Sequence, residues 1–156
     1  MKEKIIYICL TISLLLTIAC DSNKVFEKNE DLASATWAYE DTISFDVPIM
    51  DTISRYNVFV NVRHTNEYEY RNLWIYAHTH FPSGKSLKTR IDLPLADKEG
   101  KWYGKGLGEI INTQILIQPK AMMTDTGTYR FELEQNMRQN PLPNMMSVGL
   151  RVEKAN

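Results

Sequence analysis

The chain has 156 residues, with 18 Lys or Arg and 19 Asp or Glu side chains, so its formal net charge is −1. Its basic residues are scattered rather than gathered in the stripe that nucleic-acid phosphates require, so we expect no nucleic-acid partner. The length is sufficient for one domain with its own hydrophobic core.

The first nineteen residues have the layout of a secretory signal peptide. A short charged head, Lys2 to Lys4, precedes an apolar run from Ile5 to Ile18. The run has about fourteen residues, whereas a transmembrane helix needs about twenty. The polar sequence that follows contains no stop-transfer pattern. We therefore predict a signal peptide at residues 1–19 rather than a permanent transmembrane span.

Cys20 stands at the position where bacterial lipoproteins carry their lipid. The sequence LTIAC, residues 16–20, resembles the bacterial lipobox, in which a small residue precedes the cleavage site and the cysteine becomes diacylated. Thr17 departs from the usual Leu. We predict lipid attachment, palmitate included, at Cys20, because two or three acyl chains give stable anchoring. The alternative is an ordinary signal peptide that leaves Cys20 as a free thiol.

Cleavage and acylation would change the composition of the mature chain. Removal of residues 1–19 discards Cys9, and acylation consumes Cys20, so no cysteine remains for a disulfide or a thiolate site. The mature chain keeps 16 basic and 18 acidic side chains, a net charge of −2. Residues 20–34 are polar apart from the pair Val25-Phe26, and we predict that they form a lipidated tether.

From Ala35 onward, alternating apolar and polar residues predict β-strands. Tyr129, Phe131 and Leu133 alternate with charged residues in TYRFELEQ, and SVGLRVEK alternates in the same way. Further strands are expected in TISFDVPI, YNVFVNVRH, RNLWIYAHTHF, SLKTRIDLPL and NTQILIQP. This series of short strands predicts an all-β fold, a single β-sandwich over residues 35–156 that is immunoglobulin-like or jelly-roll-like.

Turn residues separate the predicted strands. Turns are expected in FPSGKS, ADKEGKW and TDTGTY. Pro48 and Pro94 are expected at sheet edges or strand ends, because proline donates no ladder hydrogen bond. The run from Asp125 to Tyr129 resembles the tyrosine corner of immunoglobulin-type domains, the alternative being a tight turn before an ordinary strand.

The segment MRQNPLPNMM, residues 137–146, contains two prolines and is expected to be an exposed loop. Its Met145-Met146 pair either forms a contact surface or fills a gap at the edge of the core.

Three histidines raise the question of a metal site. His78 and His80 are two residues apart on a predicted strand, so both side chains leave the same face with Cα atoms about 6.8 Å apart. If YNVFVNVRH and LWIYAHTH pair as a hairpin, His64 lies beside the turn and about 20 Å from His78. A third ligand is then missing, and we expect no metal site.

Motifs of catalytic and phosphate-binding sites are missing. The glycines of GKWYGKGLG have neither P-loop nor dinucleotide-binding spacing, so we expect them in turns or bulges beside Trp102 and Tyr103. There is no G-x-S-x-G and no HExxH. Glu132 and Glu134 alternate outward on a predicted strand as a solvated face. We therefore expect no catalytic residue, no cofactor and no enzyme.

Several segments taken together resemble one bacterial family. They are the lipobox with CDSNKVFEKN, YNVFVNVRHTNEYEYRNLWIY, FPSG, LADKEGKWYGKGLGEI, GTYRFELEQNMR and VGLRVEK. Their order and spacing, from Cys20 to about Lys154, resemble the gliding motility-associated lipoprotein family GldH of Bacteroidetes. The resemblance implies a membrane-anchored cell-envelope lipoprotein of the gliding machinery, linked to type IX secretion. It also implies other envelope proteins as partners, lipid at Cys20 and no catalytic residue.

Two main hypotheses of function follow. The first is a non-enzymatic assembly subunit, anchored by lipid to the outer membrane in preference to the inner one. The second is a surface lipoprotein that binds a ligand such as a glycan through exposed aromatics, with Trp37, Trp74 and Trp102 as the candidates. A hydrolase that uses Asp or Glu is a third class, and it needs two inward carboxylates in a cleft.

Overall fold

The computed structural model describes residues 23–155, and this part of the chain is almost entirely β-structure. None of its helices has the length and apolar character needed to cross a bilayer. The elements in chain order are β1 (Lys24–Asp31), the 3₁₀ turn η1 (Ala33–Ala35), β2 (Thr36–Trp37), β3 (Ile43–Ile49), β4 (Arg55–Thr65), β5 (Asn72–His80), β6 (Ser86–Pro94), β7 (Lys105–Leu107), β8 (Ile110–Met122), β9 (Gly127–Gln135), β10 (Leu142–Pro143) and β11 (Met145–Lys154).

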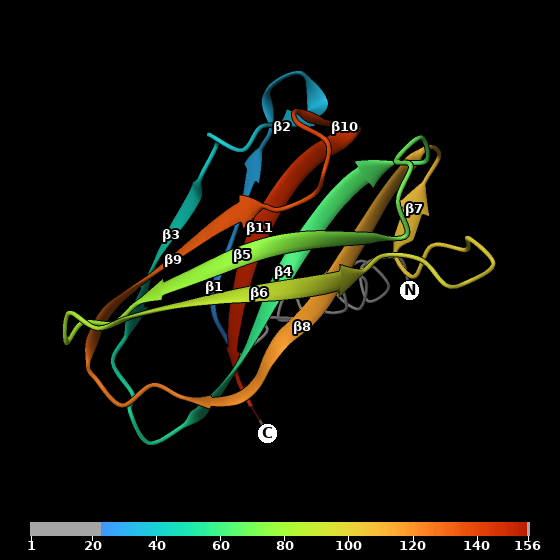
Figure 1. The fold of residues 1–156 in the computed structure, drawn as a ribbon. Helices are drawn as coiled ribbons and strands as arrows, with labels where there is room; N and C mark the ends of the chain where they lie inside the picture. Colours follow the sequence, from blue (N-terminus) through green and yellow to red (C-terminus); the bar gives the residue numbers. More distant parts are fainter. Residues whose placement is uncertain (1–22, 156) are drawn as a thin grey trace, which may run out of the picture.

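Two antiparallel sheets pack face to face and cross each other (Figure 1). We call them sheet 1, with the strand order β1-β11-β4-β8-β7, and sheet 2, with the order β3-β9-β5-β6. The short strands β2 and β10 form a separate pair at one end. The predicted all-β sandwich is therefore confirmed, and each of the seven predicted strand segments contains a strand.

The core lies between the sheets and follows the predicted alternation. In β3, every second residue from Ile43 to Ile49 is buried, and the three residues between them are exposed. In β4, the buried series runs from Tyr56 to His64 in the same way. Each buried Val, Leu, Ile or Phe side chain stabilises the fold by about 1.5–3 kcal/mol relative to exposure. Period-two patterning in the sequence is thus what makes the two sheets pack.

Proline positions match the edges of sheet 2. Pro48 lies in the edge strand β3, and Pro94 ends the other edge strand, β6. Proline has no backbone N–H to donate, and it is tolerated at both positions because an edge strand pairs with a neighbour on one side only. The prediction for both prolines is confirmed.

The two sides of the sandwich are closed differently. On the β1 and β3 side, the rings of Phe26 and Phe45 meet edge to face with centroids 6.3 Å apart. On the other side, β6 and β8 leave a mainly apolar cleft of about 220 Å³. Its lining includes Ala77, Leu87, Ile91, Ile117, Phe131 and Leu133. Leu87 is consequently half exposed although it is apolar.

The predicted tether at residues 20–34 is wrong for most of its length, because Lys24–Asp31 forms β1 and pairs with β11. Phe26, Lys28 and Glu30 lie opposite the buried residues of β11, and only Phe26 among these three is apolar. An edge strand held mainly by backbone hydrogen bonds leaves no alternating pattern for the sequence to reveal. The folded part therefore begins close to Cys20 rather than at residue 35.

The hairpin considered for β4 and β5 in judging the metal site does not form. β4 pairs with β11 and β8 in sheet 1, whereas β5 pairs with β9 and β6 in sheet 2. Residues 66–71 therefore cross from one sheet to the other. Both strands bury one face against the opposite sheet, so their similar patterns do not identify them as direct partners.

The segment at residues 137–146 is only partly the exposed loop that was expected. Leu142 and Met145 are completely buried, and Leu142–Pro143 pairs with Thr36–Trp37. The segment therefore closes one end of the core, and Met145 fills space there instead of forming a contact surface.

Tyr129 makes the hydrogen bond expected of a tyrosine corner. Its ring is fully buried, and its hydroxyl oxygen accepts a hydrogen bond of 3.0 Å from the backbone N–H of Asp125, four residues upstream. Phe81 packs edge to face on the same ring, with centroids 5.5 Å apart. The contact fixes the turn before β9 and favours the tyrosine corner over the alternative of a tight turn before an ordinary strand.

We expect Tyr129→Phe to lower the free energy of unfolding by about 1–3 kcal/mol, because the Asp125 N–H loses its acceptor in a partly buried position. Urea unfolding of the full chain in detergent measures this loss. Tyr103→Phe is the matched control, since Tyr103 is 60% exposed, and its effect should stay within about 0.5 kcal/mol. Equal stabilities of Y129F and Y103F would contradict a structural role for the corner.

Candidate functional site

The three candidate tryptophans lie in different environments. Trp37 is completely buried, and its indole N–H donates to the backbone oxygen of Asp41 at 2.8 Å. It therefore cannot act as an exposed stacking platform. Trp102 is half-buried, and its ring meets that of His64 at 4.5 Å. Trp74 is also half-buried and lies on the outer face of sheet 2.

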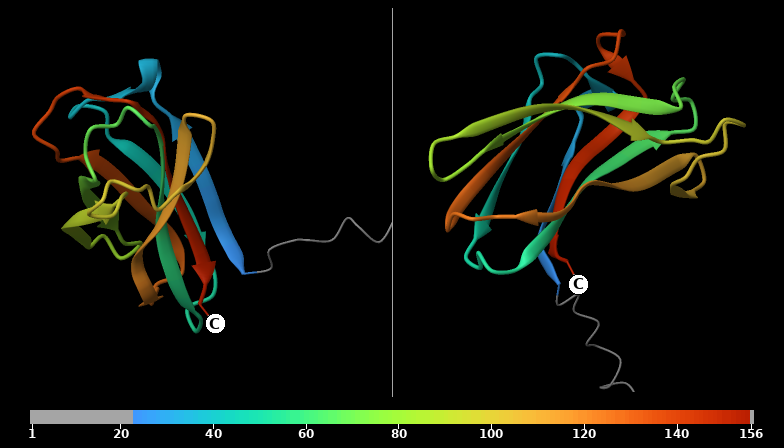
Figure 2. Two further views of the ribbon diagram at one scale, coloured as in Figure 1. Left: turned by 90° about the vertical axis from the view of Figure 1, so that its right-hand side faces the viewer. Right: turned by 60° about the horizontal axis from the view of Figure 1, so that its bottom comes forward.

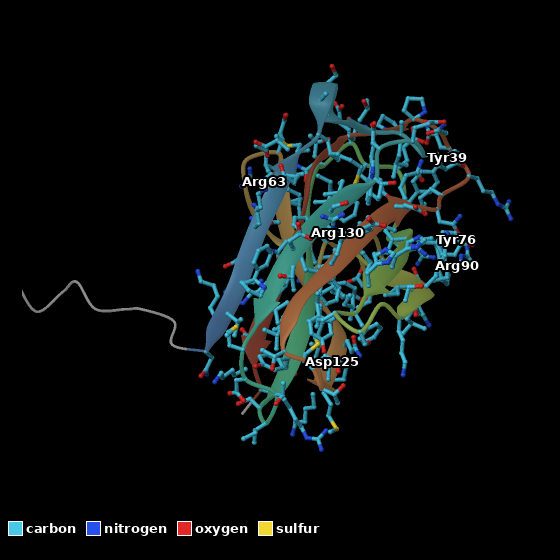
Figure 3. All side chains as sticks on the ribbon, turned by 90° about the vertical axis from the view of Figure 1, so that its left-hand side faces the viewer. Tyr39, Arg63, Tyr76, Arg90, Asp125 and Arg130 are labelled. Atoms are coloured by element: carbon cyan, nitrogen blue, oxygen red, sulfur yellow. The ribbon has the colours of Figure 1, made fainter. Side chains whose placement is uncertain are left out.

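Trp74 belongs to a row of four alternate side chains on β5. Trp74, Tyr76, His78 and His80 all point outward, and we call this row the β5 face. Figure 3 shows Tyr76 and Arg90 on one side of the molecule and Arg63 of β4 on the other. The β5 face is thus the aromatic part of the outer surface of sheet 2.

Cations from β6 cover the aromatic rings of the β5 face. The guanidinium carbon of Arg90 lies 4.0 Å from the ring centroid of Trp74, and Nζ of Lys88 lies 4.2 Å from that of Tyr76. The Arg90 Nε–H also donates to the side-chain oxygen of Asn136 at 2.7 Å. Cation–π contacts of this kind stabilise by about 0.5–1 kcal/mol at exposed positions. The indole of Trp74 is therefore occupied by a side chain of the protein itself.

Each histidine of the β5 face lies beside a glutamate of β9. His80 Nε2 is 3.1 Å from Glu132, and His78 Nε2 is 3.1 Å from Glu134. The first pair has hydrogen-bond alignment, whereas His78 Nε2 lies close to the Glu134 carboxylate without meeting that geometry. The glutamates that the sequence presents as a solvated face are therefore paired.

The charge of Glu134 is set by its surroundings. Partial burial opposes its ionisation, but the interactions with His78 and Lys88 outweigh burial and hold the pKa of this carboxyl below its usual value. Further along the sheet, Arg130 forms a two-bond contact with Asp46 at 2.8 and 3.1 Å. This hydrogen bonding lowers the pKa of Asp46. Ionised carboxylates and cations thus neutralise one another across sheet 2.

The histidines do not converge on one metal position. The rings of His78 and His80 are stacked 6.5 Å apart, whereas His64 is in sheet 1 with its ring fully buried. Within residues 23–155, no group of three or more His, Cys, Asp or Glu side chains has an arrangement that could hold a metal ion. The aromatic neighbours of His64 are Tyr68 and Trp102.

Burial dominates the chemistry of His64. Its Nδ1 lies 2.9 Å from the backbone oxygen of Thr65, whereas Nε2 has no hydrogen-bond partner in the described part of the chain. Burial lowers the pKa of His64, and the contact with Thr65 opposes this only in part. The imidazole is therefore held neutral, as a packing element rather than a base open to solvent.

The outer face of sheet 1 has a polar cluster that sequence reasoning missed. Asn29, Gly149, Asn61 and Gln114 are aligned across four strands. The Asn61 amide donates to Asn29 at 3.1 Å and accepts from Gln114 at 2.9 Å. A hollow of about 220 Å³ lies over this row. Its lining combines amide and hydroxyl side chains with the guanidinium of Arg63.

Gly149 is required for this cluster, because a Cβ there would overlap the Asn29 side chain. The sequence does show Asn and Gln at alternate, outward positions of the strands. Their alignment into one row depends on the order of the strands in the sheet, which the sequence does not show.

The glycines of GKWYGKGLG serve packing and turns. A Cβ on Gly106 would lie 2.7 Å from the backbone oxygen of Ile110 in β8, and one on Gly104 would overlap the Thr113 side chain. Gly100 has a φ of +86° and closes the turn that begins at Asp97. The predicted turn is confirmed, and Gly104 and Gly106 allow close approach to β8. The predicted signal peptide and Cys20 lie outside the described residues.

A family model and two curated relatives match the chain. The model of the GldH lipoprotein family matches residues 24–152. The "Gliding motility lipoprotein GldH homolog" of Christiangramia forsetii is 25% identical over 150 residues, covering 92% of this chain and 91% of the relative. The "Gliding motility lipoprotein GldH" of Flavobacterium johnsoniae is 26% identical over 152 residues, covering 93% and 94%.

A structural match is more distant. The solved structure described as "Structure of infectious bursal disease virus Gx strain" aligns with 86% of this chain and 33% of its own, at 18% identity and a TM-score of 0.37. A likeness of this size carries no argument about function.

We expect Arg90→Ala to expose the indole of Trp74, because the guanidinium that covers it is removed. Acrylamide quenching of tryptophan fluorescence should increase, and the free energy of unfolding should fall by about 0.5–1 kcal/mol. Lys88→Ala is the matched control: it removes the neighbouring cation, which covers Tyr76 instead. Equal quenching in R90A and K88A would show that Arg90 does not shield Trp74.

We expect stability to depend on pH through His64. Its folded pKa is lowered, so the unfolded chain binds more protons as the pH falls below about 6.5. The stability contributed by neutral His64 is complete above that pH and is lost as the pH falls through the folded pKa, by at most about 1.4 kcal/mol per pH unit.

Urea unfolding across pH 5 to 8 measures this slope, with the pH range set by the usual pKa of histidine. In His64→Phe the part of the pH dependence that comes from His64 should disappear. His80→Gln leaves His64 in place, so that pH dependence should remain. An unchanged slope in H64F would assign the pH dependence to other groups.

Proposed function

Because this chain belongs to the GldH lipoprotein family, we propose that it is a lipid-anchored, non-enzymatic subunit of the cell-envelope apparatus for gliding. The observation that carries the proposal is the family match over residues 24–152, which spans the sandwich from β1 into β11. The names of both curated relatives associate them with gliding motility.

The anchor that we propose is a lipid on Cys20 after removal of residues 1–19. The supporting features are the apolar run of about fourteen residues, too short for a span of about twenty, and Ala19 directly before the cysteine. A lipoprotein family match supports the same reading. We place the anchor in the outer membrane in preference to the inner one, and the apparatus in the group linked to type IX secretion.

The surface chemistry supports an assembly role rather than catalysis. His80 lies against Glu132, and Arg130 against Asp46, so the ionisable groups of sheet 2 are engaged with one another. Paired charges on a rigid sheet give a defined pattern for a protein partner, since complementary charges set orientation and specificity. Other envelope proteins of the apparatus are the partners that we propose.

We expect Cys20→Ala to abolish acylation, because the thiol that carries the lipid is removed. Metabolic labelling with a palmitate analogue should give no incorporation into this variant, and without the lipid most of the protein should leave the membrane pellet. Cys9→Ala is the matched control, since residue 9 lies in the segment that cleavage removes. Label retained in C20A, or lost equally in C9A, would contradict the anchor.

The assembly role is tested by crosslinking the lipidated protein in intact envelopes and purifying it. Other envelope proteins should be recovered with the wild-type chain. Recovery of the chain alone would contradict an assembly role while leaving the anchor unaffected.

A further inference from the structure

At one end of the sandwich, the start of β1 lies near several exposed apolar side chains. Lys24 at the start of β1 pairs with Glu153 near the end of β11, and Lys154 pairs with Tyr56 near the start of β4. Arg55, at the start of β4, pairs with Met122 at the end of β8. Figure 2 shows β1 beginning beside the C-terminus and the β3–β4 loop. We call this the proximal end.

Apolar side chains at the proximal end are unusually exposed. Ile53 in the β3–β4 loop is 95% exposed, Met50 at the end of β3 is 79% exposed, and Met122 is 61% exposed. None of the three contributes to the core. Exposed apolar groups that gather in one region mark a surface that contacts protein or membrane.

The loop that holds Ile53 is well organised. The Asp51 carboxylate accepts hydrogen bonds from the backbone N–H of Ile53 at 2.9 Å and of Ser54 at 3.0 Å. It also accepts from Ser54 Oγ and from Lys154 Nζ, each at 2.6 Å, and the backbone oxygen of Asp51 accepts from the Tyr56 hydroxyl. This network fixes the loop with Ile53 outward, so presenting the side chain costs little further ordering.

Two basic side chains lie beside the apolar ones. Arg55 and Lys120 are exposed, and the Arg55 guanidinium lies 3.4 Å from the backbone oxygen of Lys120. The nearby Asp51 carboxylate is neutralised by Lys154. Apolar groups with cations beside them are suited to anionic membrane surfaces, because Lys and Arg attract the headgroups while apolar groups enter the interface.

The chain upstream limits how far this end can lie from a lipid on Cys20. Lys24, where β1 begins, is four residues after Cys20, and four residue steps span at most about 14 Å when extended. A tether to residue 34 would have allowed about 50 Å. The proximal end is therefore confined near any bilayer that holds the lipid.

We propose that the proximal end docks on the lipid surface, with Ile53, Met50 and Met122 in the interface and with Arg55 and Lys120 against anionic headgroups. This inference rests on the lipid anchor of the proposed function. It adds a second, non-covalent membrane contact that fixes the orientation of the sandwich.

Site-directed fluorescence tests the contact in the full lipidated chain. Ile53→Cys and Met122→Cys are labelled with a fluorophore and reconstituted in vesicles of phosphatidylethanolamine and phosphatidylglycerol that contain nitroxide-labelled lipid. Tyr103→Cys, at a residue 60% exposed beside β7, is the control at the opposite end. Quenching at 53 and 122 but not at 103 is expected, and equal quenching at all three positions would overturn the proposal.

A second variant tests the role of the apolar side chain directly. Ile53→Asp should reduce the inserted fraction of a label at position 122 by about tenfold, the factor expected for losing one buried Ile side chain. Leu116→Asp is the matched control, because Leu116 is 46% exposed but lies within β8, away from its end. Unchanged quenching in I53D would overturn the proposal.

The two proposals fail in different ways. An acylated chain that floats with vesicles but shows no quenching at 53 keeps its anchor and overturns the docking. A chain whose N-terminal peptide lacks acyl mass overturns the anchor, and the docking fails with it. Quenching that is equally strong on neutral phosphatidylcholine vesicles would overturn the part assigned to Arg55 and Lys120.

Discussion

Pairing of β1 with β11 fixes where the fold begins relative to Cys20. Seven residue pairs, from Lys24 with Glu153 to Asp31 with Ser147, join the strands along nearly their whole length. The N–H of Lys154 also donates to the backbone oxygen of Asn23 at 2.8 Å. This ladder converts a polar segment into an edge of sheet 1, so the folded part begins four residues after Cys20. Any force applied through a lipid would therefore reach the sheet directly.

Much of the fold was readable from single segments. The burial of alternate residues in β3 and β9 follows directly from the apolar pattern of ISFDVPI and TYRFELEQ. Tyr129 could be assigned its role because turn and strand adjoin in sequence. Local patterns succeed where the burying surface is the opposite sheet, whatever strand provides it.

Other features depend on contacts between distant residues, and the sequence did not reveal them. Lys28 and Glu30 occupy inward positions of β1 and pair with each other at 2.5 Å, a polar pattern that hides a strand. Charged residues at such positions are how edge strands avoid pairing with other chains. Strand order likewise separates β4 from β5, and the buried Leu142 pairs with Trp37 of β2, which is distant in sequence.

For the candidate site residues, too, the sequence identified some features and missed those that depend on distant residues. Composition identified Trp37, Trp74 and Trp102, but burial distinguishes them: the first is in the core, the second lies beneath Arg90, and the third packs on His64. The histidine–glutamate contacts required the β5 and β9 register, in which His78 lies opposite Glu132 and Tyr76 opposite Glu134. Spacing alone could place His78 and His80 on one face of a strand, but it could not identify the glutamates that contact them.

The geometry separates membrane contact from protein contact. If the proximal end rests on lipid, as proposed, the outer face of sheet 1 remains open to the surrounding envelope, because β1, β11, β4 and β8 run away from that end. The β5 face then presents cations over aromatic rings, and the Asn61 row presents neutral amides on the opposite side. Two chemically different outer faces agree with the assembly role proposed above, because differently charged surfaces select different partners.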